Sequence, residues 1–145
     1  QMIWDIPPLD SFRVLAEIYD VPAAQFRATL DELIELLDMR ELLAKPVRNL
    51  SLGERMKCEL AAALIHRPKV LFMDEPTRSL DPASAMSLRE FVQTELKLRD
   101  GKTIVLATHN LREAELLSDR LAILVGGRVR RVGSPDEVRR VGSEG

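Results

Sequence analysis

The stretch VLFMDEP, residues 70–76, joins four apolar residues directly to two acids and a proline. A short continuous apolar run of this kind is typical of a strand buried on both faces in a parallel sheet. Because ligands of open α/β sheets bind at the carboxyl ends of the strands, Asp74 and Glu75 predict a site there. Neighbouring strand residues point to opposite faces, so we expect one carboxylate near a Mg²⁺ ion and the other near a water molecule. A turn with two solvated acids remains the alternative.

The chain changes its hydrophobic period on either side of this stretch. Apolar residues recur at helical spacing before it, whereas short apolar strands alternate with helices after it. We expect helices over residues 10–20, 23–39, 51–65, 83–99 and 111–118, and strands over residues 70–73, 103–107, 121–125 and 128–132. Asp10 or Ser11 is the expected cap of the first helix, and the glycine pair at 126–127 predicts a tight turn between the last two strands. The sequence thus predicts an α/β protein, with a helical part at residues 1–68 and part of a sheet at residues 69–145.

The composition is that of a globular protein with a substantial core. Of the 145 residues, 46% are hydrophobic and 30% are charged, which argues against intrinsic disorder. The net charge of −2 provides no basic field for nucleic acid or for an anionic membrane surface, apart from an arginine-rich segment at residues 128–140. The single Cys58 cannot form an internal disulfide and is expected to be a buried small hydrophobe. No apolar run approaches the roughly 18 residues that span a bilayer, so a membrane role would come through a partner.

Polar residues also stand at two other ends of expected elements. The tripeptide THN, residues 108–110, follows the strand expected at 103–107. A histidine on the same edge as the acid pair can donate a hydrogen bond to a phosphate, although a purely structural role for His109 is the alternative. Asp81 is placed to cap the helix that begins near Pro82. These positions extend the predicted site beyond the two acids.

The tripeptide GKT, residues 101–103, only imitates a phosphate-binding loop. The pattern requires a glycine at residue 96, which is Leu96. A true phosphate loop also follows a strand and opens a helix, whereas this tripeptide follows a helix and opens a strand. We therefore do not expect residues 101–103 to bind phosphate.

Residues 50–55, LSLGER, lie where the third helix begins. Ser51 can cap this helix, and Ser51 with Gly53 leaves backbone N–H groups accessible in its first turn. The helix dipole adds about half a positive charge at the same place. This arrangement is suited to a phosphate group.

The motifs at residues 50–55, 70–76, 79–81 (SLD) and 108–109 (TH) occur in the order found in the ATP-binding cassette (ABC) ATPases of membrane transporters, and the chain resembles this family over nearly its whole length. The resemblance implies a P-loop NTPase-like α/β fold, in which a helical subdomain is followed by part of a mostly parallel catalytic sheet. It also implies Mg²⁺-dependent ATP hydrolysis by the full-length protein.

The resemblance gives individual residues roles. Asp74 would hold Mg²⁺ through its water shell, Glu75 would be the catalytic carboxylate, and His109 would contact the γ-phosphate. A further group would contact an ATP molecule held by another subunit: Ser51, Leu52, Gly53 and Glu54 of the signature motif, and Asp81 of the D-loop. The usual signature is Leu-Ser-Gly-Gly-Gln, so Leu52 and Glu54 are departures from it.

By the same resemblance, the opening QMIWDIP, residues 1–7, lies just beyond the family's Q-loop, and Gln1 is not the metal-contacting glutamine. The Walker A loop would then precede this sequence, and the 145 residues alone would be inactive. The implied partners are a second ATP-binding subunit in a head-to-tail dimer and a transmembrane permease, most similar to the ABC-2 type. Helices at residues 10–39, with the Trp4 loop, would meet the permease at the cytoplasmic face of the membrane, and no direct contact with nucleic acid is expected.

Two other classes of function stay open on the sequence. One is a soluble ABC-type ATPase that acts on nucleic acid or ribosomes, against which the lack of a basic face argues. The other is a fragment that is non-catalytic by itself.

Overall fold

The computed structural model describes residues 2–140, so Gln1 lies outside the described residues. In chain order the elements are α1 (Pro8–Ile18), α2 (Ala23–Leu37), η1 (Arg40–Leu42), η2 (Val47–Asn49), α3 (Leu52–Leu64), β1 (Val70–Asp74), α4 (Pro82–Phe91), η3 (Val92–Arg99), β2 (Thr103–Ala107), α5 (Leu111–Leu117), β3 (Leu121–Val125), β4 (Arg128–Gly133) and α6 (Pro135–Arg140). The expected order of helices and strands is confirmed.

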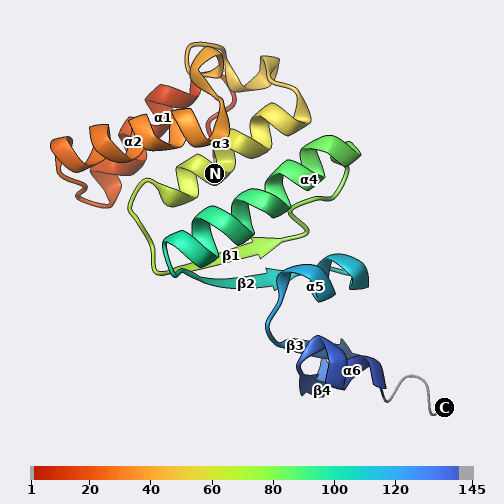
Figure 1. Cartoon of the computed structure of the whole chain (residues 1–145). Coiled ribbons are helices and arrows are strands. Elements are labelled where there is room, and N and C mark those ends of the chain that lie inside the picture. The colour runs from red at the N-terminus through yellow and green to blue at the C-terminus, as the bar shows by residue number, and fades with distance from the viewer. Residues whose placement is uncertain (1, 141–145) are drawn as a thin grey trace.

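The elements are arranged in layers (Figure 1). Helices α1, α2 and α3 form one layer, and α4 lies between them and the strands β1 and β2. The β3–β4 hairpin and α6 lie at the end of the molecule away from α1 and α2. No helix within residues 2–140 is both long enough and apolar enough to cross a bilayer.

The strands form two separate pairs among the described residues. β1 and β2 are parallel and in register from Val70–Thr103 to Asp74–Ala107. β3 and β4 are antiparallel, with a shift in register after Ile123. The turn between them contains the glycine pair at 126–127, with φ values of +56° and +72°. Glycine adopts such positive φ values without strain. The expected hairpin is therefore confirmed. β3 pairs with β4. A cavity lies between β3 and β2 and is lined by residues of both strands.

One apolar cluster holds the helical layer, α4 and β1 together. It includes Phe12 of α1, Cys58 of α3, Leu71 of β1 and Phe91 of α4, all at most 7% exposed. Burying one side chain of the size of Phe12 contributes about 1.5–3 kcal/mol to the free energy of unfolding. This core continues across residue 68, and the division of the chain at that point stays a prediction.

Cys58 is the buried small hydrophobe that the sequence predicts. It is fully buried, and burial raises the pKa of its thiol to about 11. The thiol therefore stays protonated and unreactive at neutral pH.

The prediction that the first strand is buried on both faces is wrong for the described residues. Leu71 and Met73 face the core, whereas Val70 is 46% and Phe72 is 75% exposed. A strand is buried on both faces only where elements pack on both, and α4 packs on one face of β1 (Figure 1).

Two details of the helices also differ from the expectation. α1 begins at Pro8 rather than after a cap at Asp10 or Ser11, because proline suits the first turn of a helix. Ser11 is buried within the helix, and its hydroxyl accepts from the N–H of Ile3 at 3.4 Å. The helix expected at 83–99 turns π-helical from residue 92 onward. Within this stretch the hydroxyl of Thr94 donates to the carbonyl of Glu90 at 2.8 Å.

Candidate functional site

The parallel pairing of β1 and β2 brings the two predicted strand-end motifs together. The N–H of Glu75 donates to the carbonyl of Ala107 at 2.8 Å and extends the ladder by one residue past β1. The carboxylate oxygen Oε1 of Glu75 accepts from the backbone N–H of His109 at 2.9 Å and lies 2.6 Å from its ring nitrogen Nδ1. The sequence expectation that an acid and a histidine share this edge is confirmed.

The backbone at Glu75 is held in an uncommon conformation. Its φ is +47°, in the left-handed region that non-glycine residues avoid, and Ser79 in the same loop has a φ of +64°. Such conformations persist where surrounding contacts fix them, and they cluster at functional sites. At Glu75 the ladder hydrogen bond and the contacts to His109 supply that support.

Hydrogen bonding lowers the pKa of Glu75 below its ordinary value. The main cause is the His109 side chain, helped by the His109 N–H and by the hydroxyl of Thr108, while partial burial acts in the opposite direction. Glu75 is therefore ionised at neutral pH and can accept a proton or hold a water molecule. The His109 side chain is 78% exposed and stays accessible to a ligand.

Asp74 is the last residue of β1, directly before Glu75, and is exposed. A single exposed carboxylate at this edge suits Mg²⁺, which is usually held by one or two carboxylates together with waters and phosphate oxygens. No group of three or more His, Cys, Asp and Glu side chains within residues 2–140 could form an all-protein metal cage.

Ser51 and Glu54 form a complete capping box at the start of α3. The Ser51 hydroxyl accepts from the Glu54 N–H at 3.2 Å, and the Glu54 carboxylate accepts from the Ser51 N–H at 2.9 Å. The expected cap at Ser51 is confirmed, and Glu54, one of the two departures from the usual signature, forms the other half of the box. The Ser-x-x-Glu spacing carried this signal in the sequence, where it was overlooked.

The starts of α3 and α4 lie against each other. A Cβ placed on Gly53 would come within 3.2 Å of the Ser84 hydroxyl, so the absence of a side chain there permits a close approach. Ser84 in turn donates to Asp81, from its N–H at 3.0 Å and from its hydroxyl at 2.6 Å. Asp81 is thus the N-cap of α4, as predicted, and these hydrogen bonds lower the pKa of its carboxyl.

The contacts sort the predicted residues into two groups. Glu75 and His109 form one with the strand edge, while the signature residues and Asp81 form the other at the two helix starts. The tripeptide at 101–103 belongs to neither, since it connects η3 to β2 and the Lys102 ammonium donates to the carbonyl of Pro68 at 2.6 Å. The tripeptide therefore follows a helix and opens a strand, as the sequence predicts.

Two contributors to the site were not singled out from the sequence. Thr108 contacts the Glu75 carboxylate at 3.3 Å, and Glu113 on α5 contacts Thr108 at 3.2 Å. Asn110 caps α5 by accepting from the Glu113 N–H at 3.2 Å. The Asn-x-x-Glu spacing was a usable helix-start signal, but nothing in it indicates that the glutamate is buried.

The structure thus places strand-end acids beside a histidine, and it places the starts of α3 and α4 against each other. Residues 6–78 match the family model described as ABC transporter, which is just over half of the chain. The chain is 36% identical over 129 residues to the daunorubicin resistance ATP-binding protein DrrA3 of Streptomyces coeruleorubidus, covering 89% of this chain and 40% of that protein. It is also 36% identical over 134 residues to the Nod factor export ATP-binding protein I of Ralstonia nicotianae, covering 92% of this chain and 41% of that protein.

Solved structures agree with the sequence relatives. The fold matches the structure of an ATP-binding subunit of an ABC transporter with a TM-score of 0.83 and 26% identity, over 99% of this chain and 59% of that one. The cbiO1 protein of Clostridium perfringens, part of the ABC transporter complex cbiONQ, gives a TM-score of 0.79 and 28% identity over 99% of this chain and 57% of that one. The chain belongs to the ABC transporter family of ATP-binding proteins. It spans about two fifths of the length of the two curated relatives named here.

Proposed function

We propose that this chain is the carboxyl portion of the ATP-hydrolysing subunit of an ABC transporter, with Glu75 as the residue that orients the attacking water. The observation that carries the proposal is the Glu75–His109 pair at the carboxyl edge of β1 and β2, with Glu75 held ionised by hydrogen bonds. General base catalysis by such a carboxylate is worth on the order of 10²- to 10⁴-fold in rate. His109, whose ring is mostly exposed, would hold the γ-phosphate beside that water.

Asp74 would hold Mg²⁺ next to this pair. Its exposed carboxylate at the end of β1 offers the hard oxygen ligand that the ion prefers. When bound, Mg²⁺ neutralises charge on the phosphate oxygens. Asp74 and Glu75 would thus divide the work between metal and water, as their adjacent positions predict.

The start of α3 would act on an ATP molecule held by a second subunit. Ser51, Leu52 and Gly53 lie at the start of a helix whose dipole favours an anion, and the Ser51–Glu54 capping box fixes their conformation. Glu54 and Asp81 would flank this surface, because Ser84 joins the two helix starts. The phosphate-binding loop would come from the rest of the full-length protein, which is consistent with the share of its relatives that the chain spans.

A transmembrane permease would dock on the layer formed by α1 and the preceding loop. Several apolar side chains are exposed there: Ile3, Trp4, Val14 and Ile18. The loop is tied to α3, because the Arg55 guanidinium lies 4.8 Å from the Trp4 ring centre, and it is tied to η2, because Arg48 pairs with Asp5 at 3.2 Å. Movement at this surface would therefore reach the signature motif at the start of α3.

We further propose that the partner is an ABC-2 type permease through which the subunit drives solute export or import, with the subunit on the cytoplasmic face of the membrane. The Nod factor relative is named for export, whereas a relative that is 37% identical is named for spermidine/putrescine import, so the names favour neither direction. A relative named for sulfoquinovosyl glycerol transport is 38% identical, so the transported solute is left to the permease.

The test is Glu75→Gln in the full-length protein. ATP should still bind, and turnover should fall on the order of 10²- to 10⁴-fold because the amide cannot accept the proton. Glu90→Gln, at an exposed glutamate on α4, is the matched control and should hydrolyse ATP like the wild type. Hydrolysis at the wild-type rate by Glu75→Gln would remove Glu75 from this role.

A further inference from the structure

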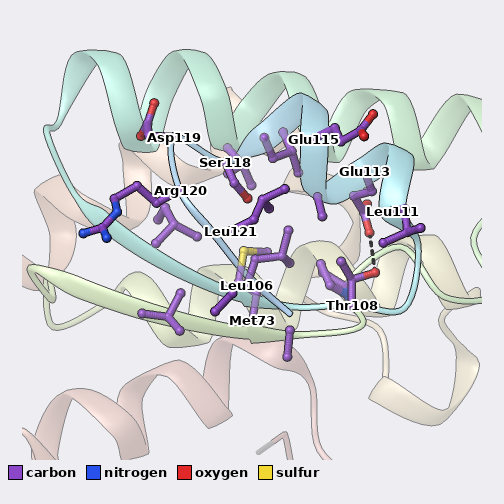
Figure 2. Close-up of a pocket in the computed structure, with 18 of the residues that line it drawn as sticks. Met73, Leu106, Thr108, Leu111, Glu113, Glu115, Ser118, Asp119, Arg120 and Leu121 are labelled. Carbon is purple, nitrogen blue, oxygen red and sulfur yellow. Dashed lines mark hydrogen bonds between the residues drawn. The ribbon is translucent and has the colours of Figure 1, made fainter. Parts of the chain in front are cut away.

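A buried carboxylate lies behind the Glu75–His109 pair. Glu113 of α5 is 1% exposed, and Figure 2 shows its side chain directed at Thr108. One of its oxygens accepts from the Thr108 hydroxyl at 3.2 Å, and the other lies 3.4 Å from Nε of Arg89. A buried charge is costly unless it is paired and hydrogen-bonded, and these two groups provide the pairing.

Thr108 stands between two carboxylates. Its hydroxyl lies 3.2 Å from Glu113 and 3.3 Å from Glu75, and it accepts from the N–H of Asn110 at 3.0 Å. A hydroxyl has one proton to donate, so Thr108 can serve only one carboxylate at a time. Its position therefore depends on Glu113 as well as on Glu75.

Arg89 connects this cluster to the other group of site residues. It lies on α4, the helix that begins at the Asp81 cap, and its pairing with Glu113 spans 24 positions of sequence. The contacts thus run from α4 through Arg89 and Glu113 to Thr108, whose hydroxyl lies beside Glu75 and donates to one of the two carboxylates at a time.

We propose that Glu113 is a positioning residue for ATP hydrolysis: through Thr108 it fixes the Glu75–His109 pair, and through Arg89 it ties that pair to the helix that carries Asp81. The proposal rests on the proposed function, since it concerns the same reaction. Capping alone does not explain the arrangement, because Asn110 caps α5 by accepting from the Glu113 backbone N–H, a contact that needs no carboxylate. What the carboxylate adds is a fixed acceptor for Thr108 and Arg89.

The experiment measures steady-state ATP hydrolysis and ATP affinity of the full-length protein in four single variants and one double variant. Thr108→Val removes the hydroxyl at nearly constant shape, Thr108→Ser keeps it, and Glu113→Ala removes the buried acceptor. Glu115→Gln is the matched control, because Glu115 lies on the same helix and also pairs with an arginine, Arg139, at 2.7 Å.

We expect Thr108→Val and Glu113→Ala each to lower kcat roughly ten-fold with little change in ATP affinity, a size typical of removing hydrogen bonds behind a reacting group. Thr108→Ser should restore most of the rate, and Glu115→Gln should leave it unchanged. The double variant Thr108→Val with Glu113→Ala should be no slower than the slower single variant, because both act through one contact.

A kcat unchanged in the Glu113 variant or in Thr108→Val would overturn the proposal, as would effects of the two substitutions that multiply. If Glu113→Ala fails to fold, Glu113→Gln takes its place, because its amide has one acceptor oxygen where the carboxylate uses two, for Thr108 and for Arg89. Loss of turnover in Glu75→Gln together with a normal kcat in Thr108→Val would reject the positioning role and leave the proposed function standing. Normal turnover in Glu75→Gln would reject the proposed function itself.

Discussion

Glu75 owes its chemical character to neighbours that are distant in sequence. Its carboxylate contacts the backbone and ring of His109, 34 residues away, and the hydroxyl of Thr108. Each contact favours the ionised form, and together they outweigh partial burial and lower the pKa. The left-handed backbone at the same residue holds the carboxylate in this position.

The depressed pKa of Glu75 predicts a measurable pH dependence. A carboxyl whose pKa is lower in the folded than in the unfolded state stabilises the fold above its unfolded pKa, and this contribution is lost as the pH falls through the folded value. In a carboxyl-carbon NMR titration, Glu75 should therefore titrate below the ordinary glutamate range. His109→Ala should raise its midpoint, because the main hydrogen-bond donor is removed.

The control for this titration is His66→Ala. His66 stacks on Tyr19 with ring centres 4.0 Å apart and is not among the causes of the Glu75 shift, so this substitution should leave the Glu75 midpoint in place. A midpoint that does not respond to His109→Ala would contradict the assignment of the cause.

At the scale of elements, caps decide where the functional helices begin. Ser51 caps α3, Asp81 caps α4 and Asn110 caps α5, each by accepting from a backbone N–H three residues on. All three are short polar residues just before a helix, so their positions could be read from the sequence. The π-helical stretch at residues 92–99 could not, because no such cap or period in the local sequence distinguishes it from an α-helix.

Removing the cap of α3 should destabilise the protein. Ser51→Ala breaks the hydroxyl half of the capping box and is expected to lower the free energy of unfolding by about 1 kcal/mol, measured by urea denaturation. Ser87→Ala is the control, because the Ser87 hydroxyl only donates back to the Ala83 carbonyl within a helix. Alanine has the higher helix propensity, so this variant should be as stable as the wild type or slightly more stable. Equal stability of Ser51→Ala and Ser87→Ala would show that the box contributes nothing.

At the scale of the whole molecule, the sequence predicted the order of elements and the meeting of two strand ends. It could do so because hydrophobic period and caps are local, and because parallel pairing brings carboxyl ends to one edge. The exposed face of β1 was not predictable in this way, since burial depends on which elements pack on each face. The separation of the β3–β4 hairpin from β1 and β2 was not predictable either. A cavity of about 1650 Å³ lies between the hairpin and β2 (Figure 2).

The buried Glu113 marks the limit of sequence reasoning at the site. A glutamate in the first turn of an exposed helix and one buried against Arg89 and Thr108 share the same local pattern. Only the packing of α5 beside α4 and β2 separates the two cases. Long-range polar contacts of this kind are where the structure adds most to the sequence.

We propose that the two groups of site residues act on one ATP molecule only when two subunits meet. The most direct measurement is sedimentation velocity of the full-length Glu75→Gln protein with and without Mg-ATP, because slow turnover should preserve the closed state. We predict a monomer without nucleotide and a dimer with it, and loss of the dimer in Glu75→Gln with Ser51→Ala and Gly53→Ala, which disturb the start of α3. A protein that binds ATP to saturation and still sediments as a monomer would contradict the account.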